Sequence, residues 1–181
     1  TGTGAATRAY TYDAAGNTLT RPGPTGSTQT LSYDDEGNLT KVATGATINS
    51  LSVYDTTGNR LIKKEGDITT LSVAGTELAF NGATSTAEAS RYYSFAGSTI
   101  AMRTGNTADK LLSVATDHQG TPHHQIRNHN GAVTTNWANP FGATRGTTPT
   151  DWAGTRGFVG GTKDATGLTH IGAREYDPVL Q

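Results

Sequence analysis

The first third of the chain repeats one phrase, Tyr12-Asp13-Ala14-Ala15-Gly16-Asn17, then Tyr33-Asp34-Asp35-Glu36-Gly37-Asn38, then Tyr54-Asp55-Thr56-Thr57-Gly58-Asn59. The tyrosines are 21 residues apart in both intervals. A fixed period of roughly 20 to 50 residues is typical of repeat architectures, in which each unit buries apolar surface only against its neighbours. The spacing therefore predicts a wall built from modules rather than a closed pocket.

Each copy of the phrase predicts the turn of a β-hairpin. Asp can accept backbone hydrogen bonds inside a turn, while Gly and Asn tolerate a positive φ. The residues before the second and third copies, 30–33 and 51–54, alternate apolar with Ser or Thr, as half-buried strands do. We therefore expect Gly16, Gly37 and Gly58 at turns with positive φ, and the three tyrosines stacked across neighbouring hairpins.

Beyond residue 61 the phrase fades, but short β-prone stretches continue to the middle of the chain. They are separated by turn signals such as Asn81-Gly82, Ala96-Gly97 and Asn130-Gly131. The expected strands cover residues 68–73, 77–80, 91–95, 98–103, 111–116, 122–127 and 132–137. No window of about 11 residues has a convincing helical period. The sequence predicts an all-β chain of consecutive antiparallel hairpins.

Composition excludes several classes of protein. Only 33% of the 181 residues are hydrophobic and 23 are Gly, which is low for a compact core, and the formal net charge is −1. No basic face favours nucleic acid, and no apolar run approaches the about 18 residues of a membrane helix. The sequence begins Thr1-Gly2-Thr3-Gly4, without the features of a signal peptide, and it contains no cysteine for disulfides or metal ligands.

Later motifs connect the repeats with a known family. The phrase resembles the YD repeat of the RHS (rearrangement hotspot) family, which is shared with teneurins and the C components of bacterial ABC toxins. Two further stretches resemble that family's core region. Their matching residues are Asp117, His118, Gly120, Pro140, Phe141, Gly142, Gly167, Leu168, Arg174, Tyr176, Asp177 and Pro178.

The resemblance implies a fold and a role. Residues 1–66 would be YD repeats and 67–181 the RHS core-associated region, ending in an irregular segment at the Asp-Pro motif. Together they would form an open or partial β-shell that encloses and delivers a C-terminal toxin. The implied partners are the remaining repeats or copies of this chain, joined through sheet edges, and the toxin cargo. The implied location is secreted or at the cell surface, and no cofactor is implied.

The same resemblance raises the question of self-cleavage by paired acids. Such chemistry needs two carboxylates that share a proton. Asp177 matches the family's Asp-Pro position, with Arg174 and Asp164 as nearby polar partners, but a second Asp-Pro downstream is missing and Gln181 stands where Gly-Arg-Phe is usual. The incomplete pair favours a structural interpretation. We expect Arg174, Tyr176 and Asp177 to be partly buried, with Arg174 pairing an acid such as Asp164 or Asp177.

Two binding alternatives remain. His118, His124 and His129 lie close to Asp117 in the sequence, but no His-x-His or His-x-x-x-His spacing occurs, so a polar turn is favoured over a metal site. The Tyr and Trp residues allow a carbohydrate-binding strip, and with it a surface adhesin or a self-assembling extracellular fibre. Tyrosine ladders also stabilise sheets directly, which favours the structural use.

Overall fold

A computed structural model describes residues 9–179, and its regular structure is almost entirely β. Thirteen strands follow one another in a single antiparallel meander in which each strand pairs with the next one in chain order. The strands are β1 Thr11–Tyr12, β2 Thr18–Pro22, β3 Thr28–Tyr33, β4 Leu39–Thr44, β5 Thr47–Tyr54, β6 Arg60–Glu65, β7 Ile68–Val73, β8 Thr76–Asn81, β9 Thr86–Phe95, β10 Ser98–Thr104, β11 Leu111–Thr116, β12 Pro122–Arg127 and β13 Val133–Thr135. The predicted all-β fold of consecutive hairpins is confirmed. The expectations placed on residues 1–8 and on Gln181 lie outside the described residues.

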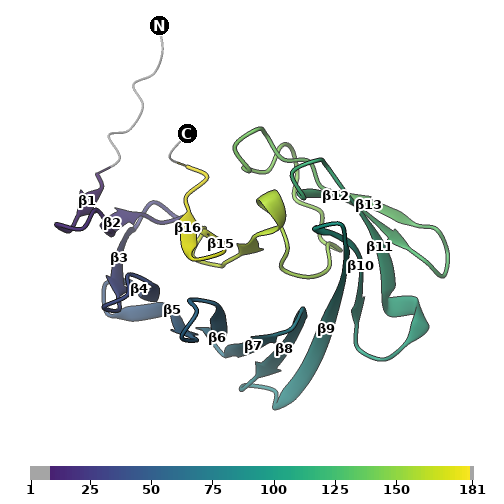
Figure 1. Cartoon of the computed structure of the whole chain (residues 1–181), viewed down its shortest axis with the longest axis horizontal. Coiled ribbons are helices and arrows are strands. Elements are labelled where there is room, and N and C mark those ends of the chain that lie inside the picture. Colours follow the sequence, from purple (N-terminus) through teal and green to yellow (C-terminus); the bar gives the residue numbers. More distant parts are fainter. Residues whose placement is uncertain (1–8, 180–181) are drawn as a thin grey trace, which may run out of the picture.

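The long sheet curves without closing, and a smaller sheet lies inside the curve (Figure 1). The smaller sheet has the order β14 Thr162–Lys163, β15 Thr169–Ile171 and β16 Arg174–Tyr176. Two short 3₁₀ turns, Ala108–Lys110 and Phe158–Gly160, complete the regular structure of residues 9–179. The meander continues through the boundary expected at residue 66, because β6 pairs with β7 there. The division into two regions stays a prediction.

The repeated phrase forms one turn, built identically each time. The Gly16 amide donates to the Asp13 carbonyl over 3.1 Å, and the Asp13 amide donates to the Asn17 carbonyl over 3.0 Å. The same pair of bonds closes the turns at 34–38 and 55–59, and it recurs at 117–121, 139–143 and 164–168. Gly16, Gly37 and Gly58 have φ values of +89°, +85° and +81°, which confirms the predicted positive φ.

The repeat tyrosines connect neighbouring hairpins through hydrogen bonds. The Tyr33 hydroxyl donates to the Thr18 carbonyl over 3.1 Å, and the Tyr54 hydroxyl donates to the Leu39 carbonyl over 2.9 Å. Both bonds reach back 15 residues, so these two tyrosines are equivalent, as predicted. The predicted ring stacking is wrong for the described residues. Within residues 9–179 the three tyrosine rings make no contact with one another, and the ring that lies beside Tyr54 is His170, at 5.9 Å between centroids.

One predicted turn differs from the sequence-based expectation. Asn81 and Gly82 do not form a two-residue turn; the loop covers 82–85, and Ser85 takes the positive φ of 54°. The Asn81 side-chain oxygen accepts hydrogen bonds from the amides of Ala83 and Thr84. This local side-chain bonding lengthens the loop beyond the two residues that the dipeptide suggested. At Ala96-Gly97 both residues do have positive φ, 49° and 82°, as a two-residue hairpin turn requires.

The buried apolar core is small and divided into two clusters. Leu31, Leu39 and Val42 pack with Leu168 at one end of the sheet. Tyr92, Met102 and Leu112 form the second cluster, with Val114 and Ala153 against it. In both clusters a residue of the C-terminal segment, Leu168 or Ala153, packs on side chains of the long sheet. The low hydrophobic content of the sequence fits this arrangement, because only the two ends of the curved sheet contribute buried apolar clusters.

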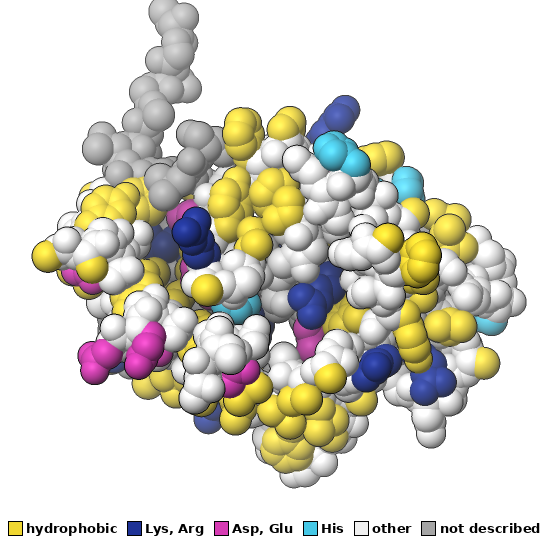
Figure 2. Space-filling view, viewed as in Figure 1, with side chains coloured by type: hydrophobic (Ala, Val, Ile, Leu, Met, Phe, Trp, Pro, Cys, Tyr) yellow, Lys and Arg dark blue, Asp and Glu magenta, His cyan; other side chains and the backbone are white. Residues whose placement is uncertain are grey.

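The convex face of the middle strands is unusually apolar. Val53 pairs with Ile62, Ile62 with Leu71 and Leu71 with Leu78, so these four side chains form one row across β5–β8. Each of the four is between 38% and 54% exposed. Hydrophobic side chains gather at the lower edge of the space-filling view, over the region of β8 and β9 (Figure 2). Exposed apolar patches of this kind mark interaction surfaces in soluble proteins.

Candidate functional site

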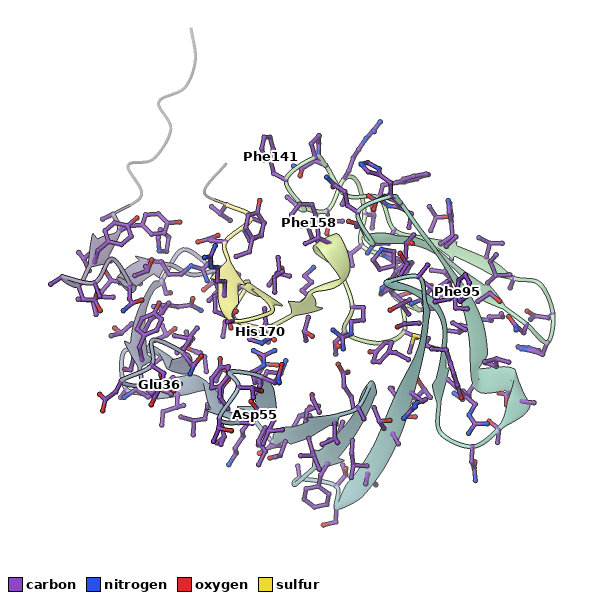
Figure 3. All side chains as sticks on the ribbon, in the orientation of Figure 1. Glu36, Asp55, Phe95, Phe141, Phe158 and His170 are labelled. Carbon is purple, nitrogen blue, oxygen red and sulfur yellow. The ribbon has the colours of Figure 1, made fainter. Side chains whose placement is uncertain are left out.

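The candidate site is the contact between the concave face of the long sheet and the segment 138–179, which runs back across it (Figures 1 and 3). Gln125 from β12 binds the backbone of Ala153 twice, donating to its carbonyl over 2.7 Å and accepting from its amide over 2.8 Å. Glu77 from β8 accepts hydrogen bonds from the hydroxyls of Thr155 and Tyr92, over 2.9 and 3.1 Å. Side chains of the sheet thus fix the first half of the segment.

A buried ion cluster fixes the turn between β14 and β15. Arg60 of β6 holds Asp164 through two contacts of 2.6 and 2.9 Å, and Lys63 of the same strand holds it over 2.8 Å. The side chains of Asp164, Arg60 and Lys63 are only 5%, 8% and 10% exposed. Burial alone would lower the pKa of Arg60, but the hydrogen bonds and charge of Asp164 outweigh burial and raise that pKa. Glu65 adds a bond to Lys63 and accepts from the Ala165 amide.

A second buried cluster fixes the end of the segment against β2. The Arg21 side chain is 2% exposed and lies 2.9 Å from the Asp177 carboxylate, measured from Nε to Oδ2. Arg21 also donates to the Thr166 carbonyl over 3.1 Å and to Gln29 over 3.1 Å. The Tyr10 hydroxyl donates to Asp177 over 3.1 Å. Because Arg21 contacts both 166 and 177, it joins two turns of the C-terminal segment to the sheet.

The three candidate catalytic residues are not brought together. Asp164 is held by Arg60 and Lys63, while Asp177 is held by Arg21, so each carboxylate is neutralised by its own cation. Two acids that share a proton need to lie side by side without such counterions. Tyr176 and Asp177 are partly buried and hydrogen-bonded, as expected, with the Tyr176 hydroxyl donating to the Phe141 carbonyl over 2.8 Å.

The expected ion pair of Arg174 is wrong. Arg174 is exposed and has no acid within 4 Å among residues 9–179. Neighbouring strand residues point to opposite faces, and Glu175 faces inward to His170 and Arg60, so Arg174 points away. The cations that hold Asp164 and Asp177 come instead from β6 and β2, more than a hundred residues earlier in the chain.

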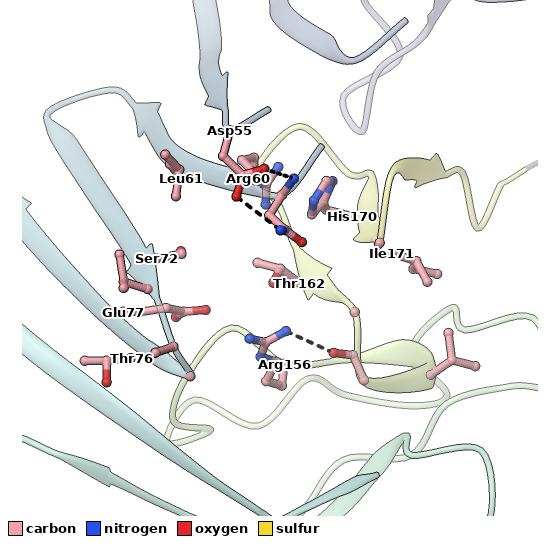
Figure 4. Close-up of a pocket in the computed structure, with 18 residues that line it drawn as sticks. Asp55, Arg60, Leu61, Ser72, Thr76, Glu77, Arg156, Thr162, His170 and Ile171 are labelled. Carbon is pink, nitrogen blue, oxygen red and sulfur yellow. Dashed lines mark hydrogen bonds between the residues drawn. The ribbon is translucent and has the colours of Figure 1, made fainter. Parts of the chain in front are cut away.

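Two cavities adjoin these clusters. The larger, of about 580 Å³, lies between β6–β8 and the segment 156–172, and its polar lining includes Arg60, Glu77, Arg156 and His170 (Figure 4). The Arg156 guanidinium lies 5.0 Å above the Tyr92 ring. In this lining Arg60 is paired with Asp164, whereas Arg156 donates to the Gly160 carbonyl over 3.3 Å and Glu77 accepts from the hydroxyls of Thr155 and Tyr92.

The smaller cavity, of about 270 Å³, lies between β2–β3 and β16. Glu175, Tyr176 and Asp177 all line it, at and just after the end of β16. Burial, with the nearby charge of Glu175, raises the pKa of Tyr33 to about 12 and that of Tyr54 to about 12. Both hydroxyls therefore stay protonated and remain donors at neutral pH.

The remaining core-motif residues serve turns. Asp117 and Gly120 form one turn of the repeated type, residues 139–142, which include Pro140 and Phe141, form another, and Gly167 lies in a third that positions Leu168 in the core. The Asp117 carboxylate lies 3.4 Å from the His123 ring, measured from Oδ2 to Nε2, and forms no such ion pair with His118, His124 or His129 in the described residues. In the described part of the chain, no three His, Cys, Asp or Glu side chains are grouped so that they could hold a metal ion.

Comparison with known proteins gives a family for this arrangement. The family model described as Teneurin YD-shell matches residues 1–181, the whole sequence. The chain belongs to the teneurin YD-shell family. Among curated proteins, none matches the sequence.

Solved structures resemble the YD-shell chain in fold. The crystal structure of TcdB2-TccC3 matches 94% of this chain with a TM-score of 0.63 and 18% identity, and the chain spans 12% of that protein. The Photorhabdus luminescens Tc holotoxin pore, carrying a substitution in TccC3, matches 94% with a TM-score of 0.65 and 19% identity, and the chain spans 11% of it. At such identities the likeness shows the fold alone. In residues 9–179, no helix has the length and apolar character that crossing a membrane requires.

Proposed function

We propose that this YD-shell chain is a structural part of an RHS-type shell that encloses and delivers a C-terminal toxin. The observation that carries the proposal is the buried anchoring of the C-terminal segment on the concave face. Asp164 and Asp177 fix that segment to β6 and β2 through nearly buried ion pairs. A cargo joined after Asp177 would therefore start on the inner side of the wall.

The long sheet supplies the second line of support. The two outermost strands of the meander, β1 and β13, each pair with one neighbour only within the described residues. Unpaired strand edges template pairing with further strands. We infer that further repeats, or copies of this chain, pair with these edges and extend the wall. Secretion or display at the cell surface belongs to the same proposal, because a toxin shell acts outside the cell that makes it.

A pair of fusions tests the enclosure. The same protease-sensitive peptide is attached after Gln181 in one fusion and before Thr1 in the other, and both are digested at micromolar protein concentration. Enclosure predicts slower cleavage of the C-terminal peptide once the protein has assembled. Sedimentation measured in parallel reports assembly. Equal cleavage of the two peptides in an assembled sample would contradict enclosure, and a monomer with both sheet edges protected from hydrogen exchange would contradict edge pairing.

A further inference from the structure

A surface beside β12 carries a group of aromatic and polar side chains that has no role in the proposed shell. After β13 the chain forms a short two-stranded hairpin, in which Ala138 pairs with Thr144 and the Arg145 amide donates to the Trp137 carbonyl over 2.7 Å. Residues directly opposite each other in an antiparallel pair place their side chains on the same face. Trp137 and Arg145 therefore share one face of this hairpin, and Asn139, two residues after Trp137, shares it too.

That face adjoins a pocket with several polar groups. The pocket, of about 260 Å³, is lined by Asn139 and Arg145 from the hairpin and by Asp117, Gln119 and His123 from β12 and the turn before it. Arg145 has no acid within 4 Å in residues 9–179. Figure 2 shows a histidine and a basic side chain beside hydrophobic ones at the upper edge of the molecule, over the end of β12.

Trp137 does not itself line the pocket, but it presents an exposed aromatic surface that adjoins the pocket through His123, which does line it. Its side chain is 51% exposed, although indole is one of the larger apolar groups. The rings of His123 and His124 both lie 5.2 Å from it and hold its position. His123 is itself fixed by Asp117 at 3.4 Å and by the Asn136 carbonyl at 3.2 Å. An exposed ring that its neighbours hold rigid loses little entropy when a ligand packs on it.

We propose that this surface binds a neutral saccharide, with a sugar ring packed on Trp137 and its hydroxyls bonded by the side chains that line the pocket. A pyranose has an apolar face of C–H groups, which suits an aromatic ring, and an edge of hydroxyls that both donate and accept. Arg145, Asn139 and Gln119 supply donors and Asp117 supplies an acceptor.

The charges of the pocket favour a neutral ligand. Burial works to raise the pKa of Asp117, but hydrogen bonds from the amides of Thr121 and Gln119 outweigh it and lower that pKa, so Asp117 is ionised at neutral pH. Its negative charge offsets the positive charge of Arg145. A nucleotide or another multiply charged anion needs an excess of cations, which this lining does not offer. The proposed site is independent of the enclosure of a toxin.

The chain has two tryptophans, which makes the test direct. Trp152→Phe leaves Trp137 as the single indole, and its fluorescence is titrated with maltotriose, lactose and chitotriose, with galacturonic acid and AMP as charged comparators. We expect a saturable change with at least one neutral saccharide. Arg145→Ala should weaken that saccharide about tenfold or more, as the loss of a charge-assisted hydrogen bond does. Trp137→Ala, made in the otherwise unaltered chain and titrated by calorimetry because it removes the reporting indole, should show no binding.

Two controls keep the result decisive. Phe95→Ala removes another exposed aromatic, 74% exposed on the β9–β10 hairpin, and should leave binding unchanged. Calorimetric titration of the unaltered chain with the same compounds replaces the fluorescence readout if Trp152→Phe does not fold. The absence of a saturable signal with every neutral saccharide, tighter binding of a charged comparator, or equal affinity in Arg145→Ala and the unaltered chain would each overturn the proposal.

Discussion

Replacing Asp164 with Ala removes the one carboxylate that Arg60 and Lys63 share. Both cations are nearly buried, and Asp164 contacts them at 2.6, 2.9 and 2.8 Å. Removing one partner of a buried ion pair costs roughly 3–5 kcal/mol, because the other charge stays buried without its counterion. Lys63 keeps Glu65 at 2.8 Å and Arg60 keeps Glu175 at 3.7 Å, so we place the loss at the lower end, about 3 kcal/mol.

Urea unfolding followed by circular dichroism measures this loss. With an m-value of about 2 kcal/mol per M urea, 3 kcal/mol lowers the midpoint by about 1.5 M. Repeat arrays can lose part of their structure separately, so hydrogen exchange at β15 is measured as well. We expect faster exchange at Thr169–Ile171 in the variant, because this strand follows directly after the lost anchor.

Two further variants separate the ion cluster from general effects of substitution. Asp35→Ala removes an exposed acid from the turn of the second repeat and should change the midpoint little. The triple variant Arg60→Met, Lys63→Met and Asp164→Leu removes the three central charges together, while Glu65 keeps the Ala165 amide and Glu175 keeps His170, and it should recover part of the stability lost in Asp164→Ala. A loss below about 1 kcal/mol for Asp164→Ala, the level of an exposed pair, would refute the reasoning.

The other predictions concern single turns and bonds. Hydrogen bonds from Thr57 and Asn59 lower the pKa of Asp55 to about 2. The contribution of Asp55 to stability is therefore present above about pH 4 and is lost as the pH falls towards 2. The free energy of unfolding of Asp55→Asn should vary less than that of the unaltered chain over this range. Tyr54→Phe should cost about 1 kcal/mol at neutral pH, because the hydrogen bond to the Leu39 carbonyl is lost. Because the pKa of Tyr54 is raised to about 12, thermal melts of the unaltered chain should show a steeper loss of stability between pH 10 and 12 than those of the variant. Gly142→Ala should lower the melting temperature, because the added Cβ would lie 2.5 Å from Phe158 at a φ of +83°.

Local features of the sequence predicted the hairpins well. Strands β7, β11 and β12 match the expected ranges 68–73, 111–116 and 122–127. The turns followed from chemistry within five residues, where Asp accepts amide hydrogen bonds and Gly takes a positive φ. At Asn81 the same reasoning failed, because the Asn81 side chain accepts the amides of Ala83 and Thr84 and the loop extends over residues 82–85 rather than two residues.

The contacts of the candidate site were beyond sequence reasoning. Arg60 and Asp164 are 104 residues apart, and no periodic pattern relates them. The alternation of Lys63 and Glu65 placed two charges on one strand face, but it did not show that this face is concave and covered by residues 164 and 165. The resemblance to the RHS core directed attention to Arg174, whereas the cations that hold the two aspartates belong to the repeat strands.

In the middle strands the polar side chains face the concave side and the apolar side chains face the convex side, and this explains why the repeat phrase lies at the turns. On the concave side Ser52, Lys63, Thr70 and Ala79 follow one another in register, and the apolar row from Val53 to Leu78 lies on the convex side. A slip of one residue would exchange the two rows, and a sheet with a buried apolar face would resist such a slip strongly.

Here neither face is fully buried, so packing holds the register only weakly. The turn glycines and the tyrosine hydroxyls that reach the preceding hairpin supply that constraint instead, since both fix the end of each strand relative to its neighbour. A wall of this kind keeps its shape without a continuous core, which leaves its concave face available for polar contacts with the segment it holds.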